Sequence, residues 1–185
     1  VPNATSEIAI CRQVLNNLIH SCRELKIEQH ALPQWEEMLD KLPAYSINAD
    51  GAISEWSYPG IEDNYNHRHN SHLYGVYPAL EIDPIQADYL AKAAAIAIKK
   101  RLEAGRGHKS AHGLMHLALF AARLWDPELL WTMLSEFAHS GYLFTSLITS
   151  HNPGRDIYNL DATLSLPAVL MEMLVQSRPG FLYLL

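Results

Sequence analysis

Long apolar stretches are scarce in this sequence. No window approaches the roughly 20 consecutive apolar residues that a membrane-spanning helix needs. The opening residues lack the basic start and the apolar run of a secretory signal. We therefore expect neither a transmembrane segment nor a signal peptide in this chain, which leaves its cellular compartment open.

Cysteine is also scarce, with Cys11 and Cys22 as the two examples, and both fall in one expected helix. At about 1.5 Å per residue, their separation along a helix is roughly 16 Å. Bridged cysteines need Cα atoms within about 7 Å of each other. We expect no disulfide between them and interpret both side chains as small buried apolar groups.

Positive charge is in the minority, with 14 basic against 20 acidic residues and a formal net charge of −6. The basic residues form no run that could follow a phosphate backbone, so we expect neither nucleic acid nor a membrane as a partner. The content of 49% hydrophobic and 18% charged residues is typical of a globular domain. A single domain over residues 1–185 accommodates this composition.

Apolar residues recur at steps of three and four, which predicts a chain of helices. Asp83 with Pro84 and Asp126 with Pro127 provide an N-cap followed by proline, typical of helix starts. The apolar–polar alternation that is typical of strands extends over only a few residues. The fold class we expect is therefore all-α, built from antiparallel helix hairpins. The last residues, 180–185, are expected to form a strand that needs a partner. The expected helices cover about 6–27, 32–42, 83–105, 109–125, 127–139 and 165–177.

Histidines gather in two places. The segment NHRHNSHLYGVYP, residues 66–78, contains His67, His69 and His72 beside Arg68. A second set, His108, His112 and His116, repeats every four residues and so lies on one face of a helix. Three interpretations compete: a metal site, a set of structural hydrogen-bonding residues, and a pocket for a ligand with many hydroxyl groups. HxxxH spacing without the glutamate of HExxH is weak evidence for a metal.

The pocket interpretation gains from the mixture of side chains. A neutral histidine offers one donor and one acceptor, and arginine offers a fork of donors, so His-Arg-His can hold neighbouring hydroxyls of a sugar. Aromatic side chains could add apolar faces for the sugar ring, and the candidates are Trp56, Tyr65, Tyr74 and Tyr77.

Hydrolysis of a glycosidic bond usually needs two carboxyl functions beside the bond. We expect Glu62 and Asp63 to be solvated in a polar loop. For Asp161 two interpretations stay open: a carboxylate that caps backbone amides at a turn, or a functional group. The candidate carboxylates are Glu55, Glu62, Asp63, Asp156 and Asp161.

Three motifs carry a family resemblance: SEW at 54–56, HRHNSHLYGVYP at 67–78, and NLDATLSLPAVLMEMLVQS at 159–177. In order and spacing they resemble the carboxyl-terminal part of the catalytic domain of glycoside hydrolase family 95, which includes α-L-fucosidases and α-L-galactosidases. The resemblance implies an (α/α)6 toroid, of which about six helices, at most half, lie in this chain. It implies further that the general acid and an asparagine pair lie upstream, in the rest of a larger parent polypeptide.

The resemblance also implies roles for particular residues. Arg68 and His69 would hold a terminal L-fucose or L-galactose of an oligosaccharide or glycan, and Asp161 would polarise the groups that activate water in an inverting hydrolysis. Arg155, His112 and His116 would line the substrate pocket, at positions where the family carries other residues. No metal and no cofactor are expected.

Two other functions remain as alternatives. The residues that differ from the family pattern could make this chain a carbohydrate-binding or interaction module without catalysis. Alternatively, the histidine clusters could bind the metal of a metal-dependent hydrolase. The exposed inner faces of a partial toroid should promote contact with the rest of the parent polypeptide or with another copy.

Overall fold

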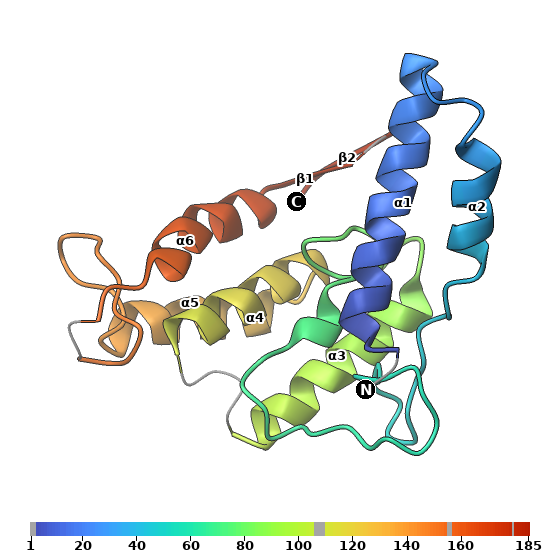
Figure 1. Ribbon diagram of the computed structural model, residues 1–185. Coiled ribbons are helices and arrows are strands. Elements are labelled where there is room, and N and C mark those ends of the chain that lie inside the picture. Colours follow the sequence, from blue (N-terminus) through green and yellow to red (C-terminus); the bar gives the residue numbers. More distant parts are fainter. Residues whose placement is uncertain (1–2, 106–109, 155–156, 179) are drawn as a thin grey trace.

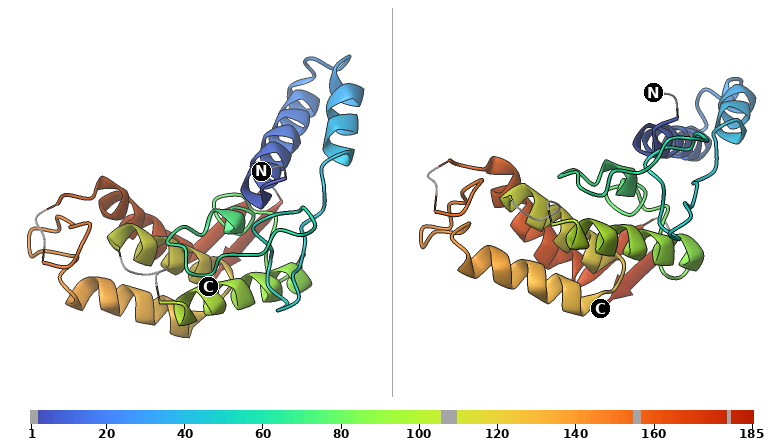
Figure 2. Two further views of the ribbon diagram at one scale, coloured as in Figure 1. Left: turned by 60° about the horizontal axis from the view of Figure 1, so that its bottom comes forward. Right: turned by 90° about the horizontal axis from the view of Figure 1, so that it is seen from below.

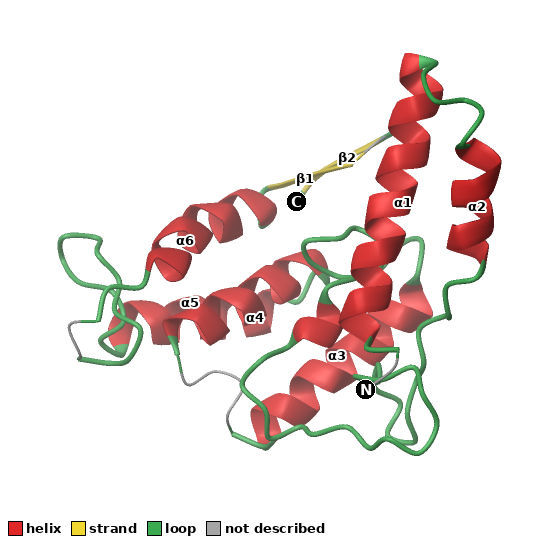
Figure 3. Ribbon diagram, viewed as in Figure 1, coloured by secondary structure: helices red, strands yellow, loops and turns green. Residues whose placement is uncertain are grey.

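The computed structural model describes residues 3–105, 110–154, 157–178 and 180–185, and these residues are mostly helical (Figures 1 and 3). The expected fold class is confirmed at that level, including the extended segment near the carboxyl end. No helix among the described residues is both long and apolar enough to span a membrane. The α-helices in the described ranges are α1 (Thr5–Leu25), α2 (Leu32–Asp40), α3 (Asp88–Glu103), α4 (Ala111–Arg123), α5 (Pro127–His139) and α6 (Leu160–Glu172).

Helices α1 and α2 form an antiparallel pair that projects from the rest of the molecule (Figures 1 and 2). Lys26 ends α1 in the left-handed conformation, which reverses the chain toward α2. A small apolar cluster of Ile19, Cys22 and Leu32 holds the two helices together. Cys11 lies on the exposed side of α1, so its interpretation as a buried group is wrong, and both cysteines are free.

The main core lies among α3, α4, α5 and α6 and the segment that precedes α3. Helix α4 is its centre, with Leu114, Met115 and Leu117 fully buried, and it packs against both α5 and α6. The predicted start of α5 is confirmed. The Asp126 side chain accepts a hydrogen bond from the backbone N–H of Leu129 at 2.9 Å, and Pro127 occupies the first turn.

Helix α3 begins at Asp88, later than the predicted start at about 83. The Asp83 carboxylate does accept hydrogen bonds from the backbone N–H groups of Ile85 and Gln86, at 2.8 and 3.0 Å. These bonds close a turn that ends before the helix starts, so the cap chemistry serves the turn. The predicted end is confirmed, because Gly105 follows α3 with a positive φ of 80°.

Helix α6 begins at Leu160 and ends at Glu172, so both predicted bounds, about 165 and 177, are wrong. The N-cap is Asn159, whose side chain accepts a hydrogen bond from the backbone N–H of Ala162 at 2.7 Å. Pro167 lies inside the helix and does not begin it. Beyond the helix the chain becomes extended, and the segment predicted as the last helical turn forms a strand.

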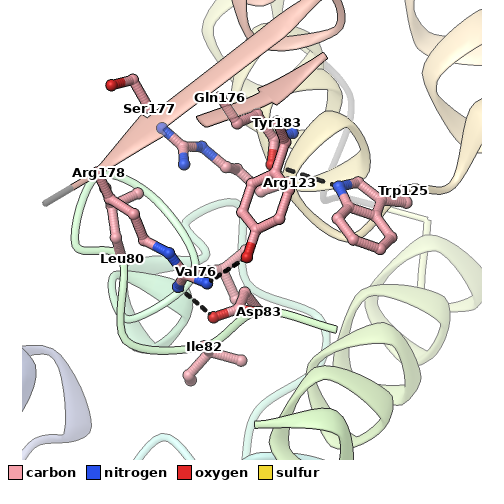
Figure 4. Close-up of a pocket in the computed structure, with 10 residues that line it drawn as sticks. All are labelled: Val76, Leu80, Ile82, Asp83, Arg123, Trp125, Gln176, Ser177, Arg178 and Tyr183. Atoms are coloured by element: carbon pink, nitrogen blue, oxygen red, sulfur yellow. Dashed lines mark hydrogen bonds and ion pairs between the residues drawn. The ribbon is translucent and has the colours of Figure 1, made fainter. Parts of the chain in front are cut away.

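That strand, β1 (Val175–Arg178), pairs with β2 (Phe181–Leu184) in an antiparallel hairpin. The strand predicted in residues 180–185 therefore finds a partner within its own chain. Figure 4 shows how the hairpin is attached: Arg178 binds Asp83 and Tyr183, and Gln176 accepts from the Trp125 indole at 3.3 Å. These contacts join the hairpin to the segment before α3 and to the end of α4.

Candidate functional site

A cavity of about 740 Å³ lies between the HRH segment and the beginnings of α4 and α6. All ten lining residues have polar side chains, and they come from three regions that are distant in sequence. We call the part formed by residues 66–69 the loop wall and the part formed by the starts of α4 and α6 with residues 151–152 the helical wall. The lining residues are Asn66, His67, Arg68, His69, Ser110, His112, His151, Asn152, Asn159 and Asp161.

The loop wall has no regular secondary structure, and its side chains are exposed. Arg68 donates from Nε to Nε2 of His69 at 3.0 Å, and the backbone N–H of His69 donates to Nδ1 of His67 at 3.2 Å. Burial, and next the positive charge of Arg68, lower the pKa of His69. A neutral imidazole beside a charged guanidinium offers the donor and acceptor pattern that sugar hydroxyls need.

The helical wall is built from two capped helix starts. Ser110 caps α4, its hydroxyl accepting from the backbone N–H of Gly113 at 3.1 Å, and Asn159 caps α6. His112 and Asp161 therefore each lie in a first helical turn, with 3.8 Å between Nδ1 of His112 and Oδ2 of Asp161. The Asp161 side chain is 71% exposed. Of the two interpretations of Asp161, the capping role belongs to Asn159, and the Asp161 carboxylate lines the cavity.

A row of aromatic rings crosses from one wall to the other. The ring centroids of His69 and His112 are 6.1 Å apart, and those of His112 and His116 are 4.1 Å apart. Burial, and next the neighbouring His112, lower the pKa of His116 to about 4, so this histidine is neutral at pH 7. The row continues from His116 to Phe120, with 6.2 Å between centroids.

His116 lines a second cavity of about 610 Å³, which shares His67 and His69 with the first. This cavity is more apolar, and Tyr74, Tyr77 and Phe120 contribute to it. Two of the four predicted aromatic side chains, Tyr74 and Tyr77, are thus beside the site.

Trp56 and Tyr65 line neither cavity. The Tyr65 hydroxyl is engaged elsewhere, since it donates to Asp50 at 3.0 Å and accepts from Asn48 at 2.7 Å.

The structure brings most of the predicted site residues together. Arg68, His69, His112 and Asp161 share the first cavity, and His116 lies one helical turn further along α4. Arg155 and Asp156, like His108 of the second histidine set, lie outside the described residues. The roles that the resemblance implies for these residues remain predictions.

Besides the capping residues Ser110 and Asn159, two further lining residues, His151 and Asn152, were not predicted as site residues. They precede Pro153 and Gly154 in a turn, and the backbone carbonyl of His151 accepts from the N–H of Ala111 at 3.1 Å. The contact attaches this turn to the start of α4. The one sequence signal for the pair is a polar turn shortly before Asp161, which is too common to identify a site.

Two of the carboxylates near the loop wall, Asp63 and Glu55, are bound to other groups of the protein. Asp63, which we expected to be solvated, accepts from the backbone N–H of Glu55 at 2.6 Å and from Nδ2 of Asn48 at 2.5 Å. That expectation is wrong for Asp63, whereas Glu62 is exposed as expected. Glu55 forms an ion pair with Arg101. Among the described residues, no group of three or more histidine, cysteine, aspartate or glutamate side chains is placed to hold a metal ion.

Imidazoles, a guanidinium fork, amides and one carboxylate on a concave wall suit a ligand that carries many hydroxyl groups. The family model described as "Glycosyl hydrolase family 95 catalytic domain" matches residues 2–174. The chain belongs to this family, which confirms the resemblance seen in its motifs.

A relative in Arabidopsis thaliana, alpha-L-fucosidase 2, is 31% identical over 193 residues. The alignment covers 99% of this chain and 22% of that relative, so the chain spans about a fifth of the relative's length. A domain of family 95 implies an (α/α)6 toroid.

Proposed function

We propose that this chain forms part of an inverting exo-glycosidase that removes terminal α-L-fucosyl or α-L-galactosyl residues from glycans. The observation that carries the proposal is that Arg68, His69 and Asp161, from segments far apart in sequence, line one polar cavity. Family membership supports it, because domains of this family act on glycans. In this proposal residues 1–185 are about half of a toroidal catalytic domain in a larger polypeptide.

Arg68 and His69 hold the sugar in this proposal. The guanidinium donates to ring or hydroxyl oxygens, while the neutral imidazole of His69 both donates and accepts. His112 and His116 face the same ligand from the other wall, where their imidazole rings add polar contacts and flat surfaces. Arg155, outside the described residues, keeps its predicted place among the sugar-binding groups.

Asp161 acts in the chemical step. An inverting hydrolase protonates the leaving oxygen with one group and activates a water molecule on the opposite face of the sugar with another. A carboxylate that is open to solvent and close to His112 can polarise the groups that orient this water. The general acid comes, in this proposal, from another part of the parent polypeptide.

The test is release of L-fucose from a 2-linked fucoside by the parent polypeptide and its variants. Arg68→Ala should raise KM, because it removes sugar contacts, and Asp161→Ala should chiefly lower kcat. Arg23→Ala is the matched control, since Arg23 is an exposed arginine paired with Glu36 on the α1–α2 pair. Full activity in both cavity variants would contradict the proposal.

One observation favours a second function, a carbohydrate-binding module without catalysis. Among the described residues that line the first cavity, Asp161 is the single carboxylate, whereas glycoside hydrolysis usually uses two. Titration calorimetry with L-fucose and D-galactose, together with the turnover assay, separates the two functions. Binding by the parent polypeptide without release of sugar would favour the module.

A further inference from the structure

The loop wall has little backbone support of its own. Between described residues, no backbone-to-backbone hydrogen bond involves any residue from 58 to 69. The segment is part of no helix or strand, so it also lacks the backbone hydrogen bonds of regular secondary structure. A chain of this kind keeps one conformation only if side chains hold it, because each ordered residue costs about 1–2 kcal/mol of backbone entropy.

Arg101, in the last turn of α3, provides such a contact. Its guanidinium donates from Nη1 to the backbone carbonyl of His67 at 2.8 Å and from Nη2 to the Glu55 carboxylate. Among the described residues, the first of these is the one hydrogen bond that joins residues 67–69 to any other part of the protein. Arg101 is completely buried, at 0% exposure, although it carries a charge.

A buried charge is costly unless it is paired and hydrogen-bonded. Glu55 supplies the opposite charge, and its second carboxylate oxygen accepts from the backbone N–H of Asn64 at 3.1 Å. The backbone N–H of Glu55 donates to Asp63 at 2.6 Å. The pair of Glu55 and Arg101 therefore fixes the segment at two points, near residues 63–64 and at His67.

We propose that Arg101 is a positioning residue for sugar binding: by holding the His67 carbonyl it sets the direction in which Arg68 and His69 project into the cavity. The inference rests on the proposed function, because it assigns Arg101 to the same sugar site. Arg101 lines neither cavity, so it does not itself touch the sugar. Lysine in its place could pair with Glu55 but offers a single ammonium group where the guanidinium forms a fork.

The test measures kcat, KM and thermal unfolding in the parent polypeptide with Arg101→Lys and Arg101→Met. Both variants should raise KM by about tenfold, the usual size for loss of a hydrogen bond from a charged group. The change in kcat should be smaller, because Asp161 on the helical wall stays in place. If Arg101→Met does not fold, Arg101→Lys, which keeps the charge beside Glu55, provides the result.

The matched control is Arg178→Met, which removes another arginine–carboxylate pair, with Asp83 at the hairpin (Figure 4). Arg178 lines neither of the two cavities of the sugar site. It should lower thermal stability and leave KM within about twofold of the unchanged protein. A KM within twofold in Arg101→Lys, or an equal rise of KM in Arg178→Met, overturns the positioning role.

Arg68→Ala in the same assay separates the two proposals. If it raises KM while Arg101→Lys does not, only the role of Arg101 is wrong. If Arg68→Ala leaves KM unchanged, the proposed sugar site is wrong, and the role of Arg101 falls with it.

Discussion

The two walls of the cavity are held in place in different ways. His112 and Asp161 lie on the helical wall, where Ser110 and Asn159 cap the two helices and fix the first turns. Arg68 and its neighbours lie on a loop that depends on a buried ion pair between distant residues. One wall is therefore set by local helix chemistry and the other by tertiary contacts. Changes to each wall should have separable effects.

The largest expected effect comes from the helical wall. Asp161→Asn keeps the size of the side chain and removes its charge, so it should lower kcat by about a hundredfold or more, the usual contribution of a positioned group in proton transfer. KM should change little, because the loop wall is intact. Fucose release under saturating substrate measures this. Asp40→Asn, at the exposed end of α2, is the control, and an equal loss there would refute a specific role for Asp161.

The next effect concerns the pH dependence of stability and His72, which lies three residues after the loop wall. Burial, and next the charge of Arg101, lower the pKa of His72 to about 3. Between about pH 6.5 and pH 3, His72 is protonated in the unfolded chain and neutral in the folded chain. The free energy of unfolding should therefore fall as pH falls through this range. At pH 5 the loss from this one group should reach about 2 kcal/mol relative to pH 7.5.

Urea unfolding at both pH values checks this expectation. His72→Phe should unfold with a smaller difference between pH 7.5 and pH 5, since the titrating group is gone, whereas His20→Gln on the exposed face of α1 should leave the difference as it is. Equal differences in all three proteins would show that His72 is protonated to the same extent in both states.

The smallest effect concerns the cap of α6. Asn159→Ala removes the side-chain acceptor for the Ala162 N–H and should lower the free energy of unfolding by about 1 kcal/mol. Asn159→Asp keeps an acceptor oxygen and should retain most of the stability. Thermal unfolding of the two variants distinguishes them, and equal stability would argue that Asn159 does not cap the helix.

Sequence patterns located the helices where cap and apolar spacing agree, as at Asp126 and Pro127. The same rules placed the start of α6 too late. Proline is common in the first turn of a helix, so the rules assigned Pro167 to that position, but it lies in the interior of α6. In the structure α6 begins at Leu160, after its cap Asn159, and packs against α4.

The site could likewise be predicted from sequence only in part. The motif containing Arg68 and the motif containing Asp161 could each be recognised alone, but their meeting at one cavity depends on the fold. From sequence, Arg101 is one of two basic residues in the last turn of a helix, a position typical of exposed side chains. Its burial depends on Glu55, 46 positions away. No local pattern carries that information.

The most direct test of the sugar site is a crystal structure of the parent polypeptide with L-fucose bound. We expect the sugar between the two walls, with Arg68 and His69 within about 3 Å of its hydroxyl oxygens and Asp161 on the opposite side. A sugar bound elsewhere, or contacts to only one wall, would contradict this account.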